Sequence, residues 1–170
     1  MPAHSLRKIC VFSGLLWLLV PLPARADLKD AGAHHRPQML SVFTGFHMDF
    51  RHGSGLPVTL SGRYYYPIVP DGFGRTINDE FGIEAGIDML FKLGKHGDIG
   101  IGLPVAALYD LHFSEKFDAY AKLGFSVHID HDARPFPYAA VGMRLKLNES
   151  LYFRVEAGYP LVLVGLGFAF

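Results

Sequence analysis

The chain has a single cysteine and a single tryptophan, Cys10 and Trp17, and both lie within its first 26 residues. The rest of the chain therefore has no disulfide and no thiol chemistry. No apolar run after residue 26 reaches the roughly 20 residues that a membrane-spanning helix needs, so any later crossing would have to use strands. The sequence also lacks zinc-spaced cysteines, a phosphate-binding glycine loop and a nucleophile elbow.

Residues 1–26 have the pattern of a cleaved secretory signal peptide. Arg7 and Lys8 precede an apolar stretch, and residues 24–26 fit a small-x-small cleavage site. A membrane anchor is the alternative, but the apolar stretch is short for a spanning helix. Cleavage would lower the number of Lys and Arg residues from 16 to 13 against 16 Asp and Glu. The resulting excess of negative charge argues against nucleic acid as a partner.

From residue 38 onward, apolar and polar residues alternate, and a period of two predicts strands. The expected strands are Gln38–Phe50, Val58–Tyr66, Glu80–Lys92, Asp98–Leu111, Phe117–Ile129, Tyr138–Leu147 and a pair within Leu151–Phe170 that turns at Gly158-Tyr159-Pro160. Pro104 removes a ladder donor, and we expect a β-bulge there. Residues 27–37 are polar, and we expect a flexible lead-in. The prediction is an all-β, eight-stranded antiparallel barrel over residues 38–170.

The alternation alone does not say which face of the strands lies inside. A soluble lipocalin-like periplasmic carrier would have an apolar interior, whereas a membrane barrel has lipid outside and a polar lumen. Glycines recur on the polar face, at Gly45, Gly82, Gly86, Gly100, Gly102, Gly124, Gly142, Gly165 and Gly167. Glycine weakens a solvent-facing strand, but small residues inside a narrow eight-stranded barrel leave room for long side chains. This pattern favours the membrane barrel.

The final strand is apolar on one face and ends with Phe168 and Phe170 in phase. Such an ending resembles the closing strand of bacterial outer-membrane β-barrels. Residues 38–170 as a whole resemble the small eight-stranded members, the OmpA transmembrane domain and OmpX. The resemblance implies an up-and-down transmembrane barrel in the cell outer membrane, with both termini on the periplasmic side. It also implies contact with lipid and lipopolysaccharide, and recognition of the final strand by the barrel-assembly machinery. We expect a monomer without a cofactor.

Charged residues of both signs lie on the face that would line the lumen. They are Arg63, Glu84, Asp88, Lys122, Arg144, Lys146, Arg154 and Glu156. A buried charge is far less costly when it is paired and hydrogen-bonded. The set could be a gate or selective pore, but we favour a structural plug. The leading hypothesis for function is therefore a structural or surface-interaction protein, with a narrow gated channel as the alternative.

Two short motifs suggest catalysis or metal binding as alternatives. His112-Phe113-Ser114 resembles the His-x-Ser pair of outer-membrane lipid A deacylases, which would make Ser114 a nucleophile and His112 its base. The expected topology puts this motif at the periplasmic end, however, and we expect a polar pair beside a turn and no enzyme. His128, Asp130, His131 and Asp132 are candidate metal ligands. Because adjacent strand residues point to opposite faces, a solvated loop without metal is the expectation.

Overall fold

The computed structural model describes residues 38–47, 57–74, 77–92, 98–129 and 133–170. The expected signal peptide and lead-in lie outside these residues, as does the end of the first expected strand at residues 48–50. In the described part of the chain, no helix is long and apolar enough to cross a membrane.

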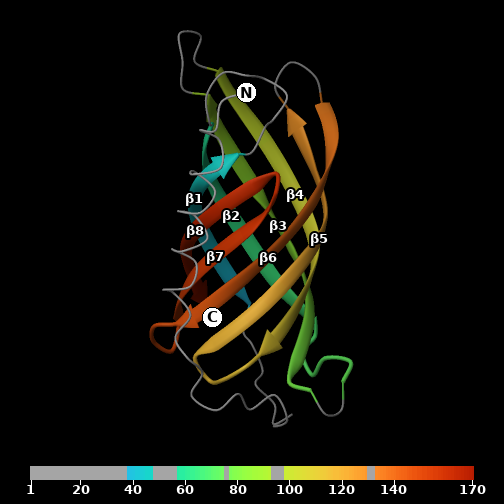
Figure 1. The fold of residues 1–170 in the computed structure, drawn as a ribbon, viewed down its shortest axis with the longest axis vertical. Coiled ribbons are helices and arrows are strands. Elements are labelled where there is room, and N and C mark those ends of the chain that lie inside the picture. The colour runs from blue at the N-terminus through green and yellow to red at the C-terminus, as the bar shows by residue number, and fades with distance from the viewer. Residues whose placement is uncertain (1–37, 48–56, 75–76, 93–97, 130–132) are drawn as a thin grey trace, which may run out of the picture.

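Eight strands form one closed antiparallel barrel in which each strand pairs with its neighbours in sequence and the first pairs with the last (Figure 1). The strands are β1 (Met39–His47), β2 (Val58–Val69), β3 (Asp79–Lys92), β4 (Asp98–His112), β5 (Phe117–Ile129), β6 (Ala133–Lys146), β7 (Leu151–Tyr159) and β8 (Leu161–Ala169). The predicted all-β, eight-stranded architecture is confirmed. We call the end at which β1 begins and β8 ends the lower end, and the opposite end the upper end, as in Figure 1.

Two strands extend beyond their predicted limits by three or more residues. β6 begins at Ala133, five residues before the predicted Tyr138, although the added segment contains Pro135 and Pro137. This segment pairs with β5 alone, because the pairing of β6 with β7 starts only at Ala139. Proline is tolerated on such an edge, where a missing N–H breaks no second ladder. β2 likewise continues past Tyr66 to Val69, with a register shift between Pro67 and Val69.

The prediction of a β-bulge at Pro104 is wrong. Pro104 pairs with Ser126 of β5 in unbroken register. On the β3 side, the pairs Ala85–Val105 and Asp88–Gly102 also keep one register across the proline. The proline therefore costs a ladder donor without adding a residue to the strand, and the irregularity falls at Pro67–Val69 instead.

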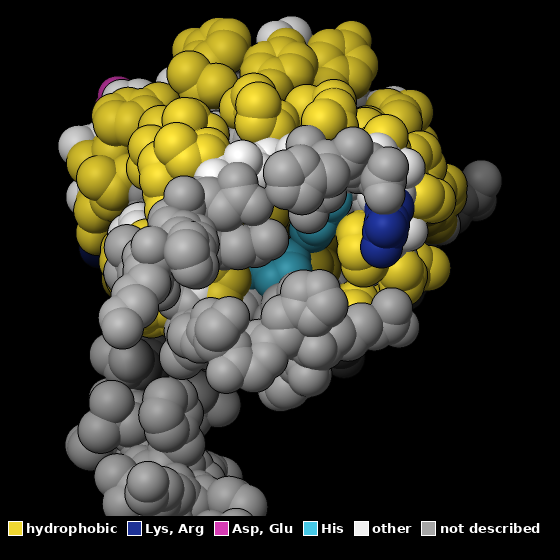
Figure 2. Space-filling model, turned by 90° about the horizontal axis from the view of Figure 1, so that it is seen from above, with side chains coloured by type: hydrophobic (Ala, Val, Ile, Leu, Met, Phe, Trp, Pro, Cys, Tyr) yellow, Lys and Arg dark blue, Asp and Glu magenta, His cyan; other side chains and the backbone are white. Residues whose placement is uncertain are grey.

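The apolar face of the strands lies outside and the polar face inside. Along β1, residues alternate strictly between buried and exposed. Exposed side chains on the wall include Leu123 at 71% and Val141 at 63% relative exposure, and Figure 2 shows hydrophobic side chains around the outer wall. Charged residues fill much of the interior. This parity is that of a membrane barrel and is opposite to that of a lipocalin-like carrier.

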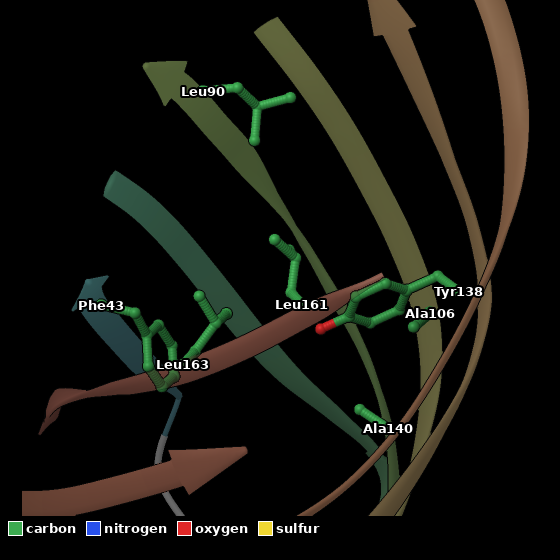
Figure 3. Packing of buried hydrophobic residues seen from close by; sticks show 7 residues of the cluster. All are labelled: Phe43, Leu90, Ala106, Tyr138, Ala140, Leu161 and Leu163. Carbon is green, nitrogen blue, oxygen red and sulfur yellow. The ribbon is translucent and has the colours of Figure 1, made fainter. Parts of the chain in front are cut away.

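The interior also contains two apolar clusters. The upper apolar cluster consists of Phe43, Leu90, Ala106, Tyr138, Ala140, Leu161 and Leu163 (Figure 3). The lower apolar cluster consists of Met39, Tyr65, Leu108, Tyr120, Tyr152 and Ala169. The lumen is therefore filled by side chains of both kinds, as expected for a barrel of eight strands.

Inward-facing glycines make room for the large side chains. A Cβ at Gly142 would lie within 3 Å of the Tyr120 ring, and one at Gly86 would meet the side chain of Arg63. At Gly100, in contrast, the nearest atoms would be at ordinary contact distance, 3.6 Å. Glycine is thus required by close packing at some positions of the lumen face and not at others.

We predict that Gly142→Ala destabilises the barrel while Gly100→Ala does not. The added methyl group at position 142 must displace the Tyr120 ring, and overpacking of this kind costs about 1–3 kcal/mol. Urea unfolding of the detergent-folded protein, followed by tyrosine fluorescence, gives the two changes in unfolding free energy. Equal destabilisation by both variants would contradict the packing role of Gly142.

Candidate functional site

Six charged side chains meet inside the middle of the barrel, and we call them the central network. They are Arg63, Glu84, Asp88, Lys122, Arg154 and Glu156, each at most 4% exposed. The inward parity of β2, β3, β5 and β7 brings them together from four strands. Three cations face three carboxylates, so the network carries no formal net charge.

Glu156 is a hub of this network. Its Oε1 accepts hydrogen bonds from Lys122 Nζ at 2.6 Å, from Arg154 Nη2 at 3.1 Å and from the Tyr120 hydroxyl at 2.8 Å. Its Oε2 accepts one from the Tyr138 hydroxyl at 3.1 Å. Charge-assisted hydrogen bonds of this kind are what a buried carboxylate requires.

Glu84 links the two sides of the lumen. It is ion-paired with Lys122, and its Oε2 accepts a hydrogen bond from Arg154 Nη2 at 2.8 Å. On its other side, the Nε of Arg63 lies 3.9 Å from Glu84 Oε1, and Arg63 Nη1 lies 2.5 Å from Asp88 Oδ1. The ion pairs therefore run without interruption from Asp88 to Glu156, across the barrel.

The central network also contacts both apolar clusters. The Arg154 guanidinium lies 4.8 Å from the ring centroid of Phe43 in the upper apolar cluster and 5.2 Å from that of Tyr120 in the lower apolar cluster. Arg154 Nη1 also donates to Ser41 Oγ at 2.6 Å. Cation–π contacts are strongest where the cation is desolvated, as it is here.

A second polar group, which we call the lower cluster, lies nearer the lower end. It consists of Glu80, Asp110, His112, Asp118 and Arg144, all buried. Arg144 is ion-paired with Asp110, and the Tyr65 hydroxyl donates to Glu80. His112 Nδ1 lies 3.2 Å from Asp118 Oδ1.

The predicted lumen charges separate into these two groups. Seven of the eight are buried in the lumen, but Arg144 belongs to the lower cluster, and Lys146 is half exposed at the end of β6. Sequence analysis did not include Glu80, Asp110 and Asp118. They share the inward parity of Glu84 and Lys122, so the alternation alone could have found them.

The His112-Phe113-Ser114 motif places its two polar side chains in different environments. His112 is buried and faces Asp118, as described above. Ser114 is half exposed, and its Oγ accepts hydrogen bonds from the backbone N–H groups of Phe117 at 3.1 Å and Lys116 at 3.4 Å. The serine oxygen is thus used to close the turn between β4 and β5.

Of the candidate metal ligands at the upper end, Asp130, His131 and Asp132 lie outside the described residues. His128 is half buried, and its ring centroid lies 5.2 Å from that of His47 and 4.7 Å from that of Phe136. Figure 2 shows histidine side chains in the mouth of the barrel at this end.

Phe168 and Phe170, the expected assembly signal, are both exposed at the lower end of β8. The backbone N–H of Phe170 donates to the carbonyl of Gln38 at 3.0 Å. The last residue therefore continues the pairing that closes the barrel.

Comparison with known proteins identifies the fold. No family model and no curated protein sequence matches the chain. A de novo designed transmembrane β-barrel matches it with a TM-score of 0.58 and 18% identity, over 79% of this chain and 95% of that one. The outer-membrane protein Ail of Yersinia pestis, in a phospholipid bilayer nanodisc, matches with a TM-score of 0.50 and 10% identity, over 79% and 99%. The chain therefore has the fold of the small eight-stranded transmembrane barrels.

We predict that Glu156→Gln destabilises the folded barrel by about 3–5 kcal/mol, because it leaves buried cations without their carboxylate. Val155→Ala, the adjacent residue on the lipid-facing side of β7, exchanges only lipid contacts and should cost less. The two unfolding midpoints in detergent with urea measure the difference. A larger effect of Val155→Ala would contradict the assignment of the two faces.

Proposed function

We propose that the protein is an integral outer-membrane barrel whose lumen is closed by the central network, with a structural or surface-interaction role. The observation that carries the proposal is the uninterrupted set of ion pairs from Asp88 to Glu156. An eight-stranded barrel has an interior just wide enough for side chains to fill. Here the central network and two apolar clusters occupy it, and the formal charges of the network balance.

The outer face of the barrel indicates which molecules would surround it. Its exposed apolar side chains suit a lipid environment and, in the outer leaflet, lipopolysaccharide. We propose that the lower end faces the periplasm. It has four-residue turns after β4 and β6 and the exposed Phe168 and Phe170, and a longer connection of nine residues between β2 and β3. There the final strand is available to the barrel-assembly machinery before closure, and a closed barrel has no free edge that requires a second copy.

One observation favours a surface role for the upper end. The first residues of β6, Ala133–Tyr138, pair with β5 only and stand beyond the end of β7. Arg134, Pro135 and Pro137 are exposed on this projecting hairpin. Prolines make the edge a poor template for strand addition, so the hairpin would present its side chains to a partner.

Planar-bilayer recording tests the closed lumen. We expect the wild-type protein to show no steady conductance, because the central network and the two apolar clusters fill the lumen with side chains. Glu156→Gln should increase the frequency of opening, whereas Lys146→Gln, which changes a charge outside the network, should not. A steady conductance of the wild-type protein would support the narrow channel instead.

We propose no enzymatic role, because the Ser114 oxygen accepts backbone hydrogen bonds in a turn. Mass spectrometry of lipid A from cells that produce the wild-type protein or Ser114→Ala should give the same acyl-chain pattern. Loss of an acyl chain that requires an intact Ser114 would establish the lipid A-modifying hydrolase.

A further inference from the structure

The lower cluster contains a set of potential metal ligands that the closure of the lumen does not use. Asp110 and His112 lie at the end of β4, and Asp118 lies at the start of β5 beyond a four-residue turn. One ligand atom from each of these side chains lies within 4.8 Å of the others. All three residues are at most 1% exposed. Two strands of a closed barrel thus hold three donor groups in fixed positions.

The formal charges of the lower cluster do not balance. Three carboxylates, those of Glu80, Asp110 and Asp118, accompany one guanidinium and one imidazole. The neighbouring carboxylate of Asp79 is engaged elsewhere, by the backbone of Phe73 and Gly74 and by the Tyr109 hydroxyl. A cation bound among these side chains would interact favourably with the buried carboxylates. The central network, with three cations and three carboxylates, has no such excess.

Oδ1 of Asp110 is buried and has no hydrogen-bond partner among the described residues. Asp110 uses its other oxygen, Oδ2, for Arg144, so Oδ1 is available to a ligand. A buried polar atom left without a partner is uncommon and points to an ion or water that completes the site.

The geometry around His112 fits a metal ion on its Nδ1 side. Nδ1 lies 3.2 Å from Asp118 Oδ1. With metal–ligand distances of about 2.0–2.2 Å, two donors at this separation subtend an angle of about 100° at a shared ion, close to tetrahedral. On the other side of the ring, Nε2 lies 3.8 Å from Glu80 Oε2. A metal-bound histidine usually directs its second nitrogen to such a carboxylate, which fixes the ring.

We propose that Asp110, His112 and Asp118 bind a divalent transition-metal ion at the lower end of the lumen, with Glu80 positioning the imidazole. An imidazole with two carboxylates favours transition metals over Mg²⁺ and Ca²⁺, which prefer oxygen ligands alone. The bound ion would join β4 to β5 just above their turn and would compensate the excess negative charge.

Zinc binding by the full-length, detergent-folded protein tests the proposal. After removal of metal with EDTA, Zn²⁺ is titrated in competition with a chromophoric chelator. We expect one tight equivalent that is lost in His112→Gln and in Asp118→Asn. Glu80→Gln, which removes only the positioning group, should weaken binding by about 10–100-fold. His47→Gln is the matched control, since it replaces a buried histidine at the opposite end, and it should bind as the wild-type protein does.

A second measurement keeps the test valid if the variants fold poorly. In the wild-type protein, Mn²⁺ should broaden the amide signals of residues 110–118 in NMR spectra and leave those of β8 near Leu161 sharp. Binding that survives in both His112→Gln and Asp118→Asn would place the metal elsewhere and overturn the proposal. Failure of the wild-type protein to compete with the chelator would also overturn it, leaving a histidine paired with carboxylates.

Discussion

The burial of charged side chains inside a narrow closed barrel is the constraint on which the rest of the structure depends. Lipid outside requires that every backbone polar group be paired, and only closure of the sheet achieves this. Closure places alternate side chains in the lumen, where an unpaired charge is costly. Glu84 and Glu156 are therefore surrounded by Lys122, Arg154 and tyrosine hydroxyls. The apolar exterior and the polar interior both follow from the alternation of apolar and polar residues along each strand.

The same constraint explains the composition of the lumen face. Large side chains on the lumen face need space beside them, and a glycine at the paired position of the adjacent strand provides it, as Gly142 does for Tyr120 and Gly86 for Arg63. Gly142 leaves space for the Tyr120 ring, whose hydroxyl then donates to Glu156. The frequency of glycine on the polar face is thus the counterpart of the long side chains beside it.

Strand existence and the orientation of each face could be predicted from the sequence because both depend on a period of two. The pairs of side chains that meet across the lumen could not be predicted. They depend on the register between strands, which the sequence does not specify. Arg144 pairs with Asp110, 34 residues away, rather than with Glu156. The start of β6 was missed because Pro135 and Pro137 argue against a strand unless the segment is known to be an edge.

The two polar groups of the lumen differ in what stabilises their buried charges. In the central network, each charge is compensated by another side chain, so its integrity depends on the protein alone. In the lower cluster, the metal ion that we propose would add a contribution from the solution, because Asp110, His112 and Asp118 would bind it together. The lower cluster lies beside the turn that joins β4 to β5, whereas Arg154 of the central network contacts both apolar clusters. Under these two proposals, a barrel whose lumen is closed by the central network still binds an ion at its lower end.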